Sequence, residues 1–356
     1  MKKLLKLSII VVILSAFCLN VAADETSDRL LSDFEATLPE GYERVAEWDG
    51  SEVGADALLS EILAALSGEG GRISSFLLLM LGSLAVISLA RTAPFPIFST
   101  VQRGVSIVSS LAIAERLVAV FTDMSGDLST LNGFFASLIP VFSSVSLASG
   151  SIEGAAAQAA GMNLILSLVG GMATSFLSAV IGFGFAMGII SVFGDEGASN
   201  ISRGIKSFFM WCLGLGTAVL MGTLSLQTLV STSRDTAAMR AARYMTTGLV
   251  PVVGSTVSAS LSTLAAGLAY VKGIIGASSI FVIISLLVSP LIVVLIYRLI
   301  LSVSITLAEF IGSSAAARSF SAFRSSLDTL IAIYALSALV YVFEIILFIK
   351  SGVPLL

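Results

Sequence analysis

Long apolar runs recur along most of this 356-residue chain, and they restrict the folds that it can adopt. A helix needs about 20 apolar residues to cross a hydrocarbon layer of roughly 30 Å. Four runs approach or exceed that length: ISSFLLLMLGSLAVISLA (Ile73 to Ala90), FFMWCLGLGTAVLMGTLSLQTLV (Phe208 to Val230), IIGASSIFVIISLLVSPLIVVLIY (Ile274 to Tyr297) and LDTLIAIYALSALVYVFEIILFI (Leu327 to Ile349). We therefore expect an all-α fold, a polytopic transmembrane helical bundle.

Weaker runs raise the expected number of crossings to about seven. They are Gly104 to Phe121, FFASLIPVFSSVSLASG, and the short run Leu299 to Ile311, which contains Glu309. The run from Met162 to Phe193 exceeds one span and is rich in glycine (Gly170, Gly171, Gly182, Gly184 and Gly188). We expect it to form either a re-entrant hairpin or two short spans, so that some helices of the bundle are broken, around Gly170 here and around Pro290 in the second half.

The first 72 residues differ from the rest in character. Residues 1–23 combine a basic start, an apolar stretch and small residues at the −3 and −1 positions of a cleavage site after Ala23, which predicts a signal peptide; an uncleaved anchor is the alternative. Residues 24–72 contain thirteen of the 23 acidic residues and two amphipathic patterns with helical spacing. We expect an acidic extracytoplasmic helical segment over 24–72 and a polytopic membrane domain over 73–350.

Several chemistries lack their residues. The chain has no histidine, and cleavage after Ala23 leaves Cys212 as its one cysteine, which excludes a Cys/His metal site and an internal disulfide. It has no P-loop, no nucleophile elbow and no Asp-rich metal loop. The acidic balance argues against nucleic acid as a partner. We expect no enzyme, no cofactor and no metal.

The segment from Arg243 to Ser262 mixes small and polar residues and lies between two apolar runs. Gly254, Ser258, Ser262 and Ala266 recur every four residues and form a small-residue face. In a membrane, such a face lets helices approach closely. It can serve packing inside one subunit, a subunit interface or the lining of a pore. Gly184 and Gly188 have the related GxxxG spacing.

Ionisable residues also lie within apolar runs, among them Glu115, Arg116, Glu309 and Glu344. A charge at the centre of a membrane helix costs about 2.5 to 3.5 kcal/mol even on the most lenient scale, so such residues are functional candidates. We expect Glu115 and Arg116 at a membrane edge or a broken helix, and Glu344 to reach the interface near the end of its span. Glu309 is the candidate for a pathway or partner contact.

The C-terminal half contains a series of motifs. They are R-x-x-R-Y from Arg240, LVPVVG ending at Gly254, YVKGIIG ending at Gly276, and SPLIVVLIYRL from Ser289. This series, together with MWCLGL from Met210, resembles the stage III sporulation protein AE family of endospore-forming bacteria. The matching residues are Arg240, Pro251, Val252, Val253, Gly254, Lys272, Gly276, Pro290 and Tyr297, and Gly273 departs from the Asn expected after the lysine.

The resemblance implies a function and a set of partners. Proteins of this family belong to an eight-member mother-cell set that joins a forespore membrane protein to form a channel-like, secretion-like complex. The partners would be the other mother-cell stage III membrane proteins, including a secretion-type ATPase, the forespore membrane partner and membrane lipid. The location would be the mother-cell membrane around the forespore. An autonomous secondary transporter is the alternative, and an intramembrane enzyme is a third, weaker hypothesis.

Overall fold

The computed structural model describes residues 25–40, 42, 55–90, 95–149, 152–193 and 253–350, with isolated positions between 204 and 222. Its long elements are α2 (Ala55–Ala90), α3 (Phe95–Ala148), α4 (Ile152–Ile165), the π-helix η2 (Leu166–Gly170), α5 (Gly171–Phe193), α7 (Val253–Phe310) and α8 (Ser314–Lys350). Residues 25–35 form a further short helix. The described residues contain no strand, which confirms the all-α expectation.

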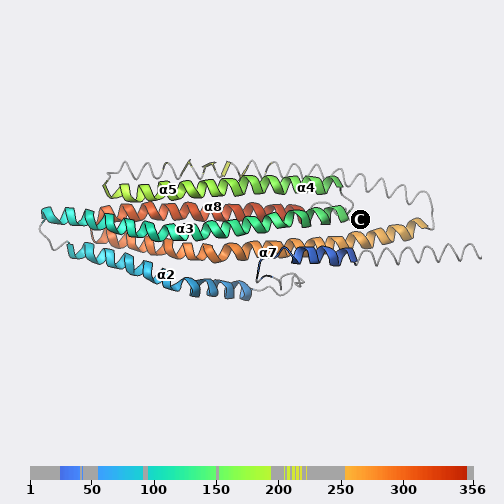
Figure 1. The fold of residues 1–356 in the computed structure, drawn as a ribbon, viewed down its shortest axis with the longest axis horizontal. Helices are drawn as coiled ribbons and strands as arrows, with labels where there is room; N and C mark the ends of the chain where they lie inside the picture. Colours follow the sequence, from blue (N-terminus) through green and yellow to red (C-terminus); the bar gives the residue numbers. More distant parts are fainter. Residues whose placement is uncertain are drawn as a thin grey trace, which may run out of the picture.

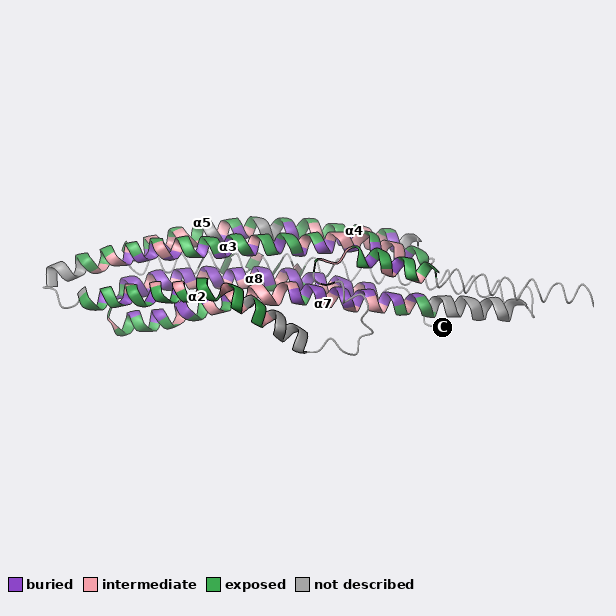
Figure 2. Ribbon diagram, turned by 60° about the horizontal axis from the view of Figure 1, so that its bottom comes forward, coloured by how far each residue is buried: buried purple, intermediate pink, exposed green. Residues whose placement is uncertain are grey.

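The helices run lengthwise side by side as an elongated bundle (Figure 1). Helix α8 packs against α7, α5, α3 and α4, whereas α2 packs against α3 and α7 at one side. Buried residues line the faces that the helices turn toward one another, and exposed residues lie on the outer faces (Figure 2). The core therefore follows the long axis of the bundle, with α8 as its central element.

Aromatic pairs connect α8 to its neighbours. Phe135 of α3 stacks on Tyr341 of α8 with ring centroids 4.2 Å apart, and Phe142 stacks on Phe348 at 3.8 Å. Phe185 of α5 lies 6.0 Å from the ring of Phe323. Such pairs add to the packing energy of apolar side chains, and here they align α3 and α5 along α8.

The glycine-rich run does not form the hairpin or the two short spans that we expected. Residues 152–193 instead form one continuous helical rod, in which η2 is a local π-helical turn. Its glycines allow close packing: a Cβ atom at Gly184 would overlap Ser326, and one at Gly188 would overlap the ring of Phe323. The spacing of these glycines allows α5 to pack closely against α8 and does not reverse the chain. The helix continues through them because packing in the bundle compensates for the low helix propensity of glycine.

Two other expected breaks are also absent. Helix α3 joins the runs expected as separate spans and contains Pro140, and α7 continues through Pro290 to Phe310. Two residues after α7 ends at Phe310, Gly312 has a φ of 77°, which few other residues adopt easily. There the N–H of Gly312 donates to the Glu309 carbonyl and that of Ser313 to the Ala308 carbonyl, the paired bonds of a Schellman cap.

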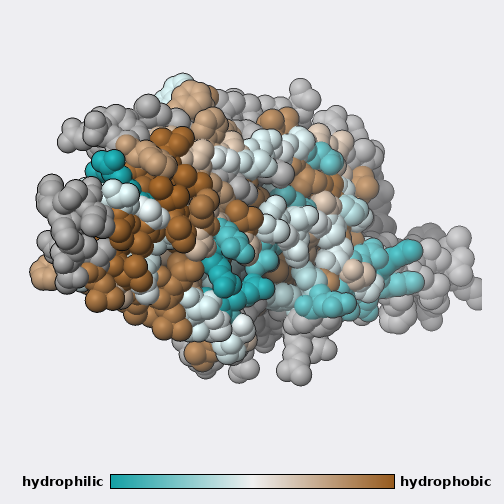
Figure 3. Space-filling view, turned by 60° about the vertical axis from the view of Figure 1, so that its left-hand side comes forward, coloured by the Kyte–Doolittle hydropathy of each residue, from teal (hydrophilic) through white to brown (hydrophobic). Residues whose placement is uncertain are grey.

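Five helical segments among the described residues are long and apolar enough to cross a membrane: Ile62–Leu89, Thr100–Ala148, Ala155–Phe193, Ala266–Phe310 and Ser314–Lys350. Hydrophobic side chains cover much of the outer surface, with hydrophilic patches between them (Figure 3). The expected signal peptide and most of the expected span from Phe208 to Val230 lie outside the described residues. The boundary expected at residue 72 falls inside α2.

Candidate functional site

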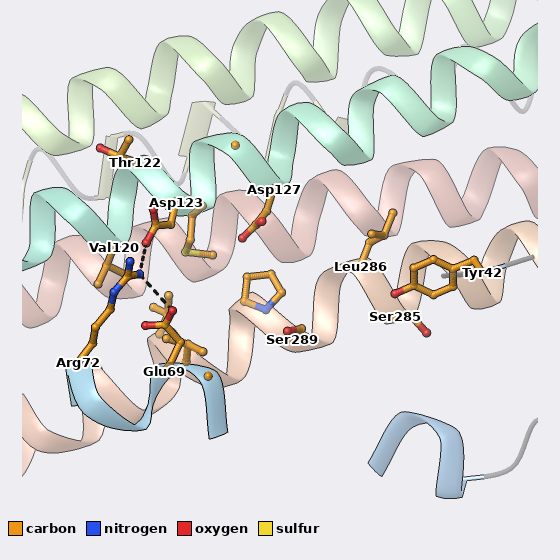
Figure 4. A pocket seen from close by; sticks show the side chains of 16 residues that line it. Tyr42, Glu69, Arg72, Val120, Thr122, Asp123, Asp127, Ser285, Leu286 and Ser289 are labelled. Carbon is orange, nitrogen blue, oxygen red and sulfur yellow. Dashed lines mark hydrogen bonds and ion pairs between the residues drawn. The ribbon is translucent and has the colours of Figure 1, made fainter. Parts of the chain in front are cut away.

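A polar pocket lies between α2, α3 and α7 (Figure 4). Its volume is about 730 Å³, which falls in the range of small-molecule sites. All three helices belong to the segments that are able to cross a membrane. A cavity with charged side chains among such helices is a candidate functional site, because ionisable groups there face a protein interior or water and not lipid.

Arg72 of α2 connects two carboxylates at one side of the pocket. Its Nη1 atom lies 3.1 Å from Oε1 of Glu69, one turn earlier in the same helix, and 2.7 Å from Oδ2 of Asp123 in α3. The side chains of Arg72 and Asp123 are more than half exposed, so this group stands at the mouth of the pocket. The two contacts hold α2 against α3 at this level.

Asp127 lies one helical turn beyond Asp123 and also lines the pocket (Figure 4). It makes no hydrogen bond or ion pair with any residue that the structure describes. With Glu69, Asp123 and Asp127 against Arg72, the lining carries three acidic groups and one basic group. The described part of the lining is therefore negatively charged when these groups are ionised.

Helix α7 forms the opposite wall with Ser285, Ser289 and Pro290. Ser285 is fully buried, and its Oγ has no hydrogen-bond partner among the described residues. Pro290 has no N–H, so the carbonyl of Leu286, which also lines the pocket, lacks the donor that a helix normally supplies. This wall offers oxygen atoms to whatever occupies the pocket.

The described residues contain no group of three or more His, Cys, Asp and Glu side chains that could hold a metal ion. The pocket has carboxylates, hydroxyls and a carbonyl, and its polar groups suit a partner rich in hydrogen-bond donors. The pocket can therefore bind such a partner through hydrogen bonds and charge complementarity.

Several residues singled out from the sequence cannot be placed in a site. Arg240, Pro251 and Val252 lie outside the described residues. Val253 begins α7, and Gly254, Ser258 and Ser262 lie in its first turns, where only the backbone is described. Whether their small-residue face packs inside the subunit, against another subunit or along a pore stays a prediction.

Other family-motif residues lie in the core of the bundle. Lys272 is buried, with Nζ 4.6 Å from the ring centroid of Phe348. Gly276 lies so close to Ile349 that a Cβ atom would overlap it. Tyr297 is buried against Phe76 of α2, with ring centroids 4.8 Å apart. These positions tie α7 to α8 and α2, and Pro290 is the motif residue that lines the pocket.

The intramembrane ionisable residues have different surroundings. Glu309 has an exposed side chain in the last turn of α7, so its role as a pathway or partner contact stays a prediction. Glu115 and Arg116 are exposed within the unbroken helix α3, so the broken-helix alternative is wrong. Glu344 does not extend to an interface: it is buried, and its Oε1 accepts a 3.0 Å hydrogen bond from Gln158 Nε2.

Of the residues that line the pocket, the sequence analysis singled out Pro290 and none of the polar ones. Two signals were present: Glu69 and Arg72 are three residues apart, and Asp123 and Asp127 are four apart, which are the spacings of neighbours on a helix. We had assigned residue 72 to the end of an extracytoplasmic segment and 123–127 to a connection between spans. The helices α2 and α3 continue through both places.

Comparisons with known proteins identify a family. A family model described as stage III sporulation protein AE matches residues 99–352, well over half of the chain. The match runs from the first turn of α3 to the end of α8 and excludes α2, so Asp127, Ser285 and Pro290 lie inside it and Arg72 lies outside. Searches of curated proteins and of solved structures found no match.

Proposed function

The chain belongs to the stage III sporulation protein AE family, and from this premise we propose that it is a non-enzymatic, multi-pass membrane component of a secretion-like channel complex between mother cell and forespore. In this proposal the chain lies in the mother-cell membrane around the forespore. It is needed for late forespore gene expression and forespore development. Its partners are the other mother-cell stage III membrane proteins, a secretion-type ATPase among them, and a forespore membrane protein.

One structural observation supports a role in a multi-subunit assembly: the exposed apolar surface is longer than a membrane is thick. Val108 and Leu147, near opposite ends of α3, are 68% and 51% exposed and lie 39 residues apart. At 1.5 Å per residue they are about 58 Å apart, and a tilt of about 40° still leaves about 45 Å.

Lipid cannot cover both positions, because the hydrocarbon layer is only roughly 30 Å thick. The same holds for α7, where Tyr270 and Phe310 are exposed and lie 40 residues apart, or about 60 Å. A large apolar surface outside the lipid is typical of a site that another protein covers. Partner subunits of a membrane complex would supply that surface.

A late forespore-specific transcription reporter tests the function. In a sporulating host that lacks this gene, engulfed forespores should stay dark, and the intact gene should restore the signal. Normal reporter activity without the gene would overturn the proposal.

The assembly can be tested separately with a photo-crosslinking amino acid placed at Val108 or at Leu147. In sporulating cells at least one position should form an adduct with another stage III membrane protein. Leu138, which is fully buried in the same helix, is the matched control and should form no such adduct. Adducts with lipid alone at both exposed positions would contradict an assembled complex.

A second candidate, an autonomous secondary transporter, is favoured by the polar pocket among the apolar helices. Transporter binding sites lie at such places, near interrupted helices. An isolated gene locus, and solute uptake by the purified chain in vesicles, would favour this candidate over the channel component. A neighbouring gene for a secretion-type ATPase would favour the first.

A further inference from the structure

The pocket between α2, α3 and α7 contains one carboxylate that the protein itself does not neutralise. Arg72 is shared between Glu69 and Asp123, at 3.1 and 2.7 Å. Asp127, one turn further along α3, has no ion pair or hydrogen bond with any described residue. Asp127 is exposed rather than enclosed, but an uncompensated carboxylate among apolar helices is still costly, so a cation from outside the described residues would stabilise it.

Ser285 gives an independent indication of a ligand. Serines inside helices usually donate to a carbonyl three or four residues earlier, as Ser279 does to Ile275 at 2.6 Å and Ser302 does to Arg298 at 2.9 Å in the same helix. Ser285 is fully buried and makes no such bond. Ser285 is one of the residues that line the pocket, so this unpaired hydroxyl lies in the pocket wall.

The oxygen atoms of the pocket wall suit a group with several N–H donors. Besides Asp127 and Ser285 they include the hydroxyl of Ser289 and the Leu286 carbonyl, which has no helical donor because Pro290 follows four residues later. An ammonium group carries three donors and a guanidinium group five, and neither carries an acceptor. An occupant with a positive charge and several donors would therefore complement the groups of this wall.

The size and the remaining walls of the pocket favour an organic cation over a bare ion. A volume of about 730 Å³ is far larger than a dehydrated metal ion needs. Val120, Met124 and Val293 supply apolar contacts, and Tyr42 adds an aromatic ring beside Ser285 and Leu286 (Figure 4). Aromatic rings attract ammonium and guanidinium groups through their negatively polarised faces.

We propose that this pocket binds an organic cation, an ammonium or guanidinium group on an apolar body, with Asp127 as its counter-ion. The cation has two possible sources, a free solute or a lysine or arginine side chain of a neighbouring membrane protein. The binding site does not depend on the channel role proposed above.

The test uses the full-length chain, with Cys18 and Cys212 replaced by serine, and the substitution Ser289→Cys to place a thiol in the pocket. In purified protein we compare the rate of modification by cationic 2-aminoethyl methanethiosulfonate with that by neutral methyl methanethiosulfonate. The ratio of the two rates should fall at least about tenfold on Asp127→Asn, which removes a charge-assisted contact with the reagent. Glu309→Gln, with the same loss of charge at the end of α7, should leave the ratio unchanged.

A second comparison does not require the Asp127→Asn protein to fold. A thiol introduced by Val303→Cys lies on the exposed face of the same helix, outside the pocket. The rate ratio at position 289 should exceed the ratio at position 303 about tenfold. Equal ratios at the two positions would overturn the proposal.

Protection experiments distinguish the two sources. If n-butylammonium chloride slows the modification at position 289, while 1-butanol and sodium chloride do not, the site binds a free organic cation. If butylammonium gives no protection, but the thiol is protected in sporulating cells and reactive when the chain is produced alone, a partner side chain occupies the site. Equal protection by sodium chloride, or no protection in either setting, would overturn the proposal.

Discussion

At the scale of single residues, buried polar side chains pair across helices. Tyr341 of α8 donates to Oδ1 of Asn132 in α3 at 2.5 Å. Ser319 of α8 donates to the carbonyl of Gly188 in α5 at 2.8 Å, and its Oγ lies 2.6 Å from that of Ser110 in α3. Because apolar packing alone allows helices to slide, these directional bonds fix the register of α3 and α5 along α8.

Replacing Tyr341 by phenylalanine should lower the free energy of unfolding by about 1 kcal/mol, because the Asn132 carbonyl oxygen loses its donor while the ring contact with Phe135 remains. Unfolding of the purified protein in mixed detergent micelles measures the change. Tyr270→Phe, at a position 64% exposed, is the control and should change stability little. Equal effects of the two substitutions would show that the hydrogen bond does not stabilise the fold.

The polar pocket shows which residues a sequence cannot bring together. The pairing of Asp123 with Asp127 follows from helical spacing, but Arg72 lies 51 residues before Asp123, and Ser285 lies still further away on α7. Only the packing of α2 and α7 against α3 places them around one cavity. Pro290 was selected for its motif, and its contribution to the pocket wall became visible only in the structure.

At the scale of elements, helix type could be predicted from the apolar runs, whereas helix ends could not. Glycine and proline normally mark the ends of helices, and we used them that way at Gly170 and Pro290. Inside a bundle the neighbouring helices supply the packing that compensates for these residues, so α5 and α7 continue. The actual end of α7 is instead set by the Schellman cap that forms at Gly312.

Gly188→Ala should destabilise the protein by about 1 to 3 kcal/mol, since the added methyl group would overlap the buried ring of Phe323 and force α5 away from α8. Gly182→Ala is the matched control on the same helix, because no atom lies within 4 Å of its new methyl group. There alanine should be neutral or slightly stabilising through its better helix propensity. A similar effect at both positions in a thermal unfolding assay would contradict close packing at Gly188.

The cap at the end of α7 gives a second prediction at this scale. Gly312→Ala should cost about 1 kcal/mol, because φ of 77° places the new Cβ atom near the carbonyl oxygen. Gly312→Asn should cost less, since asparagine adopts this conformation more readily. Unfolding midpoints of the two variants and the parent protein test the order, and a larger loss for asparagine than for alanine would argue against the left-handed cap.

At the scale of the whole molecule, the helices are longer than a membrane requires. Helix α7 has 58 residues and α3 has 54, or about 87 and 81 Å at 1.5 Å per residue, and the two lie lengthwise in one bundle (Figure 1). Even at a tilt of about 40°, α7 would extend about 67 Å along the membrane normal, more than twice the hydrocarbon thickness. The bundle must therefore project from at least one membrane surface.

Electron cryomicroscopy of the full-length chain in a lipid nanodisc should show this projection directly. We expect rod-like helical density that extends beyond the disc by at least about 20 Å, since about 67 Å of helix exceeds the roughly 45 Å of a bilayer with its headgroups. The projecting part should associate between particles, because its apolar side chains have no lipid to cover them. Density confined to the thickness of the disc would show that α3 and α7 break in the membrane, and would remove the structural support for a projecting surface that partner subunits cover.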